Sequence, residues 1–221
     1  MKRFWWFSKS NTKISSTIKN PLWNSKVKEL YTQMHDQFLH DKHRDALTTS
    51  RKILDIAPEH TATLLLVAKL HTRKKHYDKA AEYYTKILKN NESNVDARFG
   101  RAECMYFLFR YEEALEDYLE LYEKSLSNTS YILWVANTYQ KLNLMNIASR
   151  YYNKAIQDAP DDIDTHLWLW YHYMILGRYR EADEQAKIAK DLYYQQEHEA
   201  PRTDLSNIQD LEKQVKQLVK E

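Results

Sequence analysis

The sequence predicts an all-α protein, a right-handed α-solenoid of about five helix hairpins with a C-terminal capping helix. Three observations lead to this fold class. Only 2 Gly and 4 Pro occur in 221 residues, which disfavours a sheet joined by tight hairpin turns. Apolar residues fall at helical spacing along most of the chain. Alanine returns every 34 residues, at Ala46, Ala80, Ala114, Ala148 and Ala182. A fixed period of this length indicates stacked supersecondary units.

Each predicted unit consists of two helices and a turn. In the second unit, Leu64, Val67 and Ala68 give the first helix one apolar face, and the segment RKKHYD forms the turn. The second helix then buries Ala80 and Tyr84. We expect alanine at position 80 because a larger side chain would separate two helices that cross closely. The predicted bounds of the five units are 27–60, 61–94, 95–128, 129–162 and 163–198.

Two further features mark where units end and where the repeat array ends. Pro58 and Pro160 lie three periods apart and mark the ends of two units, since proline cannot continue a helix. Residues 203–221 contain an apolar stripe at spacings of three and four. We expect this segment to cap the last unit, with a coiled-coil dimerisation helix as the alternative. The stripe consists of Leu205, Ile208, Leu211, Val215 and Leu218.

These features resemble the tetratricopeptide repeat family over roughly residues 27–198. The resemblance consists of the small residue at the close crossing, the terminal prolines and two sets of aromatic residues. Met34 and Trp170 depart from the family pattern, which has a small residue at their position. The turn aromatics are Tyr77, Tyr111 and Tyr179, and the second-helix aromatics are Tyr84, Tyr118 and Tyr152.

The resemblance implies a non-enzymatic protein–protein interaction module, an adaptor or co-chaperone, whose first helices line a concave groove that binds a partner segment. Aromatic rings at these positions would supply buried area, and polar groups would fix the orientation of the ligand. Packing against neighbouring repeats is the alternative role for the rings. The predicted groove residues are Tyr31, His35, Phe38, Lys69, Arg73, Phe99, Glu103, Tyr106, Phe107, Asn137, Lys141, Tyr171 and Met174.

One known ligand class of the family is disfavoured. Members that bind the carboxylate tails of heat-shock chaperones use a Lys and an Asn one turn apart in the first repeat. Tyr31 and His35 occupy the equivalent positions here. We therefore expect no such clamp, although Lys69, Arg73 and Lys141 still suit an acidic segment.

The residue types that carry catalysis or metal binding do not form a recognisable pattern. A single cysteine, Cys104, excludes an internal disulfide and a Cys-based zinc cluster. The histidines lack the helical spacing of a zinc site, and we expect them to be packed or on the surface. Paired carboxylates such as Glu112–Glu113 begin helices, where the helix dipole favours them. We expect no enzyme activity, no metal and no cofactor.

Charge separates the N-terminal segment from the rest. Residues 1–28 hold seven basic and no acidic side chains, and the other 193 residues hold 26 basic and 31 acidic ones. The acidic body disfavours a nucleic-acid partner. We expect residues 1–26 to form a flexible, basic tail. Its aromatic cluster, Phe4, Trp5, Trp6 and Phe7, suits three further roles: contact with an anionic membrane, an organelle transit peptide, or a competitor for the groove.

The second functional hypothesis rests on this tail. It describes a membrane-associated assembly or secretion factor that the tail tethers or targets. No stretch of the chain approaches the length needed to cross a bilayer. We therefore expect a cytoplasmic protein with a protein or peptide partner, and a monomer. A peripheral membrane or organelle-targeted protein is the alternative.

Overall fold

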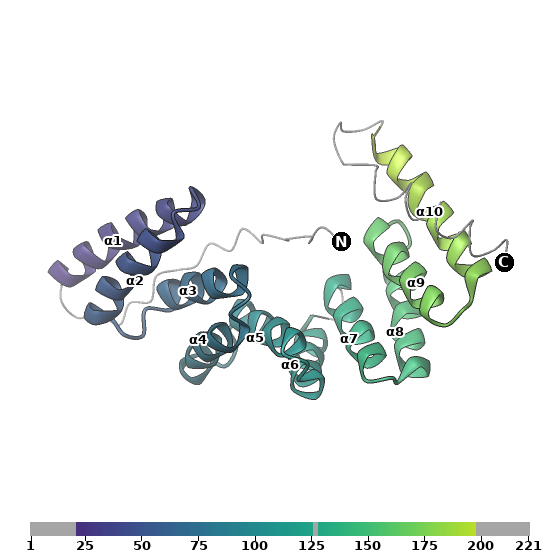
Figure 1. Cartoon of the computed structure of the whole chain (residues 1–221), viewed down its shortest axis with the longest axis horizontal. Coiled ribbons are helices and arrows are strands. Elements are labelled where there is room, and N and C mark those ends of the chain that lie inside the picture. Colours follow the sequence, from purple (N-terminus) through teal and green to yellow (C-terminus); the bar gives the residue numbers. More distant parts are fainter. Residues whose placement is uncertain (1–20, 126–127, 198–221) are drawn as a thin grey trace. The chain divides into compact units, whose positions relative to one another are not determined.

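The computed structural model describes residues 21–125 and 128–197, and these form ten α-helices and no strand (Figure 1). The chain divides into two compact units: unit 1, Met1–Leu108, and unit 2, Phe109–Glu221. The described part of the chain is therefore all-α, as predicted. The helices are α1 (Pro21–Leu39), α2 (His43–Ile56), α3 (Thr61–Arg73), α4 (Tyr77–Asn90), α5 (Val95–Phe107), α6 (Tyr111–Lys124), α7 (Thr129–Lys141), α8 (Met145–Asp158), α9 (Ile163–Ile175) and α10 (Tyr179–Glu197).

The helix boundaries follow the 34-residue period. The helices α3, α5, α7 and α9 begin at residues 61, 95, 129 and 163, and the helices α2, α4, α6, α8 and α10 begin at residues 43, 77, 111, 145 and 179. The first helix departs from the prediction, because α1 begins at Pro21, a favoured residue for a first helical position. Residues 21–26 of the predicted tail are thus helical. The tail anchor at residues 4–7 and the predicted capping helix at 203–221 lie outside the described residues.

A polar side chain begins each of four first helices. Asn94, Asn128 and Asp162 accept hydrogen bonds from the backbone N–H groups of Ala97, Ser130 and Thr165, and His60 does the same for Thr63. These N-cap residues are 34 positions apart. Each satisfies a backbone donor that the helix cannot, which stabilises the start of the helix by about 1 kcal/mol.

The turn inside each repeat has one residue with left-handed backbone. These residues are also 34 apart: Asp41, Lys75, Phe109, Asn143 and Gly177, with φ between 56° and 68°. In the second repeat, the N–H of His76 donates to the carbonyl of His71 at 2.9 Å, and the same bond joins Arg178 to Tyr173 in the fifth. This is the Schellman ending of a helix. The turns at Asp41, Lys75 and Asn143 form the same bond without glycine, which explains how so few glycines suffice.

The core of unit 1 lies between α1, α2 and α3. Met34, one of the departures from the family pattern, is completely buried there, and Ala46 and Ala80 at the predicted close crossings are also fully buried. Figure 1 shows α1 beside α2 and α3 beside α4. The cluster comprises Val27, Leu30, Met34, Phe38, Ala46, Ile53, Ala57, Leu66 and Leu70.

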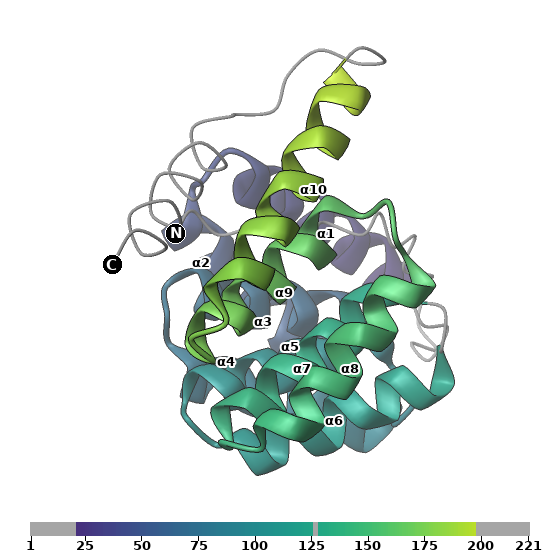
Figure 2. The ribbon, with the colours of Figure 1, turned by 90° about the vertical axis from the view of Figure 1, so that its right-hand side faces the viewer.

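Unit 2 packs its helices in the same way. Ala114, Ala148 and Ala182 have no exposed surface, and Trp170, the other departure from the family pattern, packs with Ala182 and Ala186. Figure 2 shows α7 beside α8 and α9 beside α10. The predicted alanine positions are therefore buried in both units. The main cluster comprises Ile132, Leu133, Ala136, Ala148, Tyr152, Ala155 and Leu169.

Candidate functional site

The predicted groove residues of unit 1 come from α1, α3 and α5. Direct contact joins α3 to α5, because Thr72 Oγ1 lies 3.7 Å from Cys104 Sγ. Cys104 is fully buried, and burial raises the pKa of its thiol to about 12. Such a thiol is not a nucleophile at neutral pH. Cys104 is a packing residue in this interface.

Two of the predicted residues meet at the end of α3. The Arg73 guanidinium lies over the Phe38 ring, 4.2 Å from its centroid, and its Nη1 atom is 3.5 Å from Asp41 Oδ1. Phe38 is 3% exposed and belongs to the core of unit 1. As the structure stands, the Phe38 side chain supports Arg73 and offers no surface to a ligand.

Tyr31 and His35 lie one turn apart on α1. Their ring centroids are 6.2 Å apart, and Tyr31 also packs edge-to-face on His60, 5.5 Å away. Burial raises the pKa of the Tyr31 hydroxyl. Tyr31 is half-buried and His35 is exposed, so this end of the face combines a packed ring with an accessible imidazole.

Helix α5 contributes Phe99, Glu103, Tyr106 and Phe107, all half-buried. Phe107 stacks on the turn residue Tyr77, with centroids 4.9 Å apart, and Tyr106 meets Phe107 edge-on at 5.5 Å. These contacts hold the rings of Tyr106 and Phe107 beside the turn between α3 and α4.

Lys69, on α3, is half-buried and forms no ion pair with any described residue. It is equivalent to Glu103 on α5, one repeat later. The charge of its ammonium group is therefore not balanced by a direct carboxylate contact within the described part of unit 1.

The predicted residues of unit 2 differ in exposure. Asn137 is buried within α7, and Lys141 is exposed at its last position. Tyr171 and Met174 are half-buried on α9 and pack against the cluster around Trp170. Of the four predicted groove residues in unit 2, Lys141, Tyr171 and Met174 are accessible. The ligand role of each remains a prediction.

Comparison with known proteins supports the repeat assignment. The family described as anaphase-promoting complex, cyclosome, subunit 3 matches residues 39–121. A MamA fragment from Desulfovibrio magneticus RS-1 superposes with a TM-score of 0.70 at 15% identity, covering 77% of this chain and 97% of its own. A tetratricopeptide repeat protein from Parabacteroides merdae superposes with a TM-score of 0.62 at 18% identity, covering 86% and 70%. No curated protein sequence matches the chain.

The chain has the fold of the tetratricopeptide repeat protein with which it superposes. Its 34-residue helix starts, buried alanines and left-handed turns recur with the period of that fold. At the identities quoted above, the likeness to the solved structures concerns the fold.

One polar cluster in this repeat protein was not predicted. His172 on α9 is fully buried, with Nδ1 2.6 Å from the side-chain amide of Gln140 and Nε2 2.7 Å from Ser149 Oγ. Its ring lies 4.8 Å from that of Tyr152. Burial, and next the positive charge of Arg178, lower the pKa of His172 to about 4. The imidazole is therefore neutral at neutral pH.

The hydrogen bonds of this cluster determine which nitrogen of His172 carries the proton. Gln140 Oε1 can only accept, so Nδ1–H of His172 donates to it at 2.6 Å. Nε2 is then the acceptor, and the Ser149 hydroxyl donates to it at 2.7 Å. The 34-residue period offered one signal, because His172 is equivalent to the interface residue Cys104.

The cluster is structural in character. Within residues 21–125 and 128–197, no group of three metal-ligating side chains gathers. His166 is also buried, and it contacts Gln185 and the Pro160 carbonyl. Among the described helices, none is long and apolar enough to cross a membrane.

Proposed function

We propose that this protein is a non-enzymatic interaction module, an adaptor or co-chaperone that holds a segment of a partner protein on its first helices. The observation that carries the proposal is Lys69. Lys69 is half-buried as a residue and has no carboxylate partner among the described residues, so its ammonium group is available to pair with a ligand carboxylate.

The aromatic residues of α5 support the same site. Phe99, Tyr106 and Phe107 retain partial exposure one repeat after Lys69. Rings that neighbouring rings already hold in place lose little conformational freedom on binding, which makes them good anchors for a peptide. A ligand with a carboxylate near an apolar side chain would match Lys69 together with the aromatic residues of α5.

Arg73 has a supporting role in this proposal. Its guanidinium already contacts Asp41 and Phe38. Arg73 therefore adds positive potential to the site, while its donors are already partly engaged. Lys69 is the better residue for a test, because its replacement breaks no described ion pair.

The test is affinity capture from native cell extract, with mass-spectrometric identification of what is bound. The baits are the wild-type chain, Lys69→Glu, Phe99→Ala and the matched control Lys86→Glu, which reverses an exposed charge on α4. A fifth bait lacks residues 1–20. Thermal melts followed by circular dichroism establish that each bait is folded.

The proposal predicts a partner that wild-type and Lys86→Glu capture and that Lys69→Glu and Phe99→Ala lose. Capture that is equal for all four folded baits would exclude the first-helix face of unit 1 as the binding site. Loss only on deletion of residues 1–20 would transfer the function to the N-terminal segment.

A further inference from the structure

The hairpin turns of the first two repeats carry a concentration of basic side chains. We define the basic turn edge as the five cations Lys42, Arg44, Lys74, Lys75 and Lys79. They follow the ends of α1 and α3 or begin α2 and α4. The two turns are adjacent in unit 1, because Arg73 at the end of α3 bonds to Asp41 in the preceding turn at 3.5 Å.

The cations of this edge are exposed and are not neutralised by ion pairs. None of the five forms an ion pair within the described residues of unit 1. In unit 2, by contrast, five basic residues pair with carboxylates three or four positions away in the chain. These pairs are Arg110–Glu113, Lys124–Glu120, Lys154–Asp158, Arg178–Glu181 and Lys187–Asp183.

The pKa of His71 reflects the positive charges at this place. Burial lowers its pKa first, and the positive charges of His76, Lys79 and Lys74 lower it further, against a smaller opposing effect of Asp78. Its ring stacks on Tyr83, 5.7 Å away and 11° from parallel. His71 Nδ1 is buried without a hydrogen-bond partner in the described structure. The positive charges of Lys74 and Lys79 therefore act together at this place, and such a potential attracts anions.

We infer that the basic turn edge of unit 1 binds an acidic segment of a partner protein. Charge complementarity supports an anionic ligand, and the composition of the edge favours carboxylates on a peptide. Asp45 and Asp78 lie among the five cations in the first turns of α2 and α4. They would repel the closely spaced phosphates of a nucleic acid, whereas a peptide can space its carboxylates to avoid them.

A membrane surface fits the edge less well. Leu39, which is 64% exposed, is the one large apolar side chain that the edge exposes, and the turn aromatic Tyr77 is half-buried against Phe107. Interfacial membrane binding combines cations with apolar side chains that enter the lipid. Four of the five cations are lysines, whereas phosphate recognition favours the forked guanidinium of arginine.

This inference is independent of the first-helix site in the proposed function. The turn edge lies at the ends of the helices, and its cations can be replaced while Lys69 stays unchanged. A charge reversal at Lys69 in turn leaves all five cations of the edge in place.

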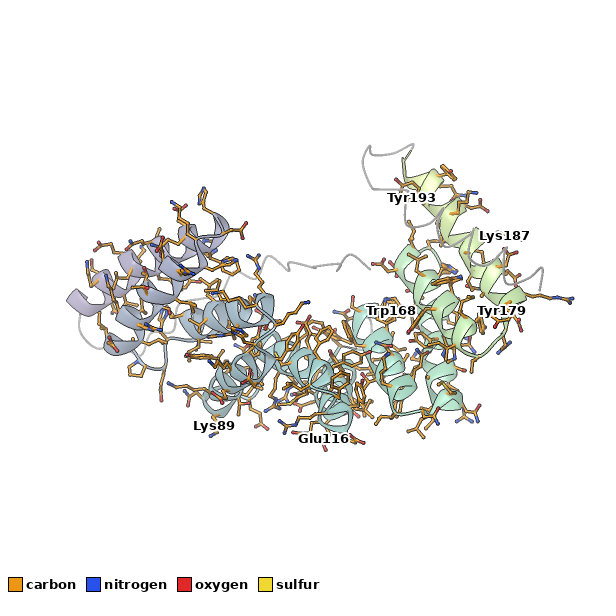
Figure 3. All side chains as sticks on the ribbon, viewed as in Figure 1. Lys89, Glu116, Trp168, Tyr179, Lys187 and Tyr193 are labelled. Atoms are coloured by element: carbon orange, nitrogen blue, oxygen red, sulfur yellow. The ribbon has the colours of Figure 1, made fainter. Side chains whose placement is uncertain are left out.

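The experiment measures binding of a defined probe to the full-length chain. The probe is a fluorescein-labelled twelve-residue peptide in which Glu and Asp alternate with Ser, and its control is the same peptide with Gln and Asn. Fluorescence anisotropy compares wild type with the turn triple variant Lys74→Glu/Lys75→Glu/Lys79→Glu. The matched control Lys52→Glu/Lys86→Glu/Lys89→Glu reverses three exposed charges elsewhere in unit 1, and Figure 3 shows Lys89 at the far end of α4.

We expect the turn triple variant to weaken probe binding by about tenfold or more, and the matched control by less than about threefold. The Gln/Asn peptide should not bind, and added salt should weaken binding of the acidic probe. If the turn triple variant melts early, Lys74→Gln/Lys79→Gln replaces it, since this pair retains the left-handed residue Lys75.

Equal weakening by both triple variants would overturn the inference, because net charge alone would then explain binding. Weakening by Lys69→Glu as large as that by the turn triple variant would assign the probe to the first-helix face instead. Vesicles of phosphatidylcholine and phosphatidylserine and a labelled single-stranded oligonucleotide complete the test. If the turn triple variant loses either of these ligands while it retains the peptide, the edge is not a peptide site.

Discussion

The turns of unit 1 and unit 2 have the same backbone conformation and expose different side chains. In unit 1 they display the cations of the basic turn edge. In unit 2 they expose apolar side chains, with Phe109 76%, Leu144 44% and Tyr179 37% exposed; Figure 3 marks Tyr179 at the start of α10. The described residues of unit 1 include 15 basic and 11 acidic side chains, and those of unit 2 include 9 and 15. Because the turn is fixed by its backbone, its side chains are free to suit different partners.

The interiors of the two units differ as well. In unit 1 the ring of Tyr84 lies directly against Gly100. One repeat later, the equivalent pair is Tyr118 and Trp134, which stack with centroids 5.4 Å apart and planes 16° from parallel. The same tyrosine position is therefore packed in two ways, and the residue opposite it decides which one is used.

The largest effect is expected from Gly100→Ala, which disturbs the contact between Gly100 and Tyr84 in unit 1. A Cβ atom at position 100 would lie 2.3 Å from Tyr84 Cζ and 2.6 Å from two other ring atoms. Helix propensity alone would make Gly100→Ala stabilising by about 1 kcal/mol. We expect the clash to dominate and the free energy of unfolding to fall by about 2–3 kcal/mol, measured by urea denaturation. Unchanged or increased stability would mean that the ring moves aside without cost.

A second variant identifies the cause of that loss. Tyr84→Leu removes the ring that meets the new methyl group. In this background, Gly100→Ala should cost less than about 1 kcal/mol or become stabilising. An undiminished cost in the double variant would assign the effect to another neighbour.

The next effect concerns position 172, where unit 2 has a histidine and the equivalent residue of unit 1 is Cys104. The pKa of His172 is about 4 in the folded protein and near 6.5 in the unfolded chain. The unfolded state therefore binds the proton more tightly, and stability falls as the pH drops from 6.5 toward 4. We expect a loss of about 2–3 kcal/mol from this residue over that range, measured by denaturation at several pH values.

His172→Phe is the control for the pH effect. It removes the titrating group and keeps an aromatic ring beside Tyr152. The variant should be less stable at pH 7, because Gln140 and Ser149 lose their partner, and its stability should fall less steeply below pH 6.5. An identical pH profile in wild type and variant would exclude His172 as the source.

A smaller effect compares equivalent turn residues. Phe109 has a φ of 62° and Gly177 a φ of 68°. Left-handed backbone costs a residue with a side chain about 1 kcal/mol relative to glycine. We expect Phe109→Gly to raise the melting temperature and Gly177→Ala to lower it. No atom lies within 4 Å of a Cβ at position 177, so that loss would come from the backbone alone. A loss of stability in Phe109→Gly would show that the exposed ring stabilises the fold.

The smallest expected effect tests the positive charge of the turns in unit 1. Replacing Lys74 and Lys79 by Gln removes two charges that lower the pKa of His71. We expect the pKa of His71 to rise, and NMR titration of the imidazole C–H signals at low salt measures this change. Lys86→Gln provides the matched control and should leave the titration of His71 unchanged.

Much of the fold was predictable from local rules that recur every 34 residues. The buried alanines, from Ala46 to Ala182, were predicted because two helices that cross closely need a small residue there. The helix starts at residues 61, 95, 129 and 163 coincide with the predicted unit boundaries. The N-cap residues Asn94, Asn128 and Asp162 repeat in the same phase and were recognisable from residue type.

The candidate site was less predictable, because helical spacing gives the face of a residue and not its neighbours. Phe38 and Arg73 were both placed in the groove, yet Phe38 is buried beneath the guanidinium of Arg73. Gln140 and His172 are 32 residues apart, and only the packing of α7 against α9 brings them together. The sequence by itself determined the period, the helices and their buried faces, since these follow from local geometry. The tertiary structure decided which side chains meet across repeats, because those contacts depend on the shapes of both partners at once.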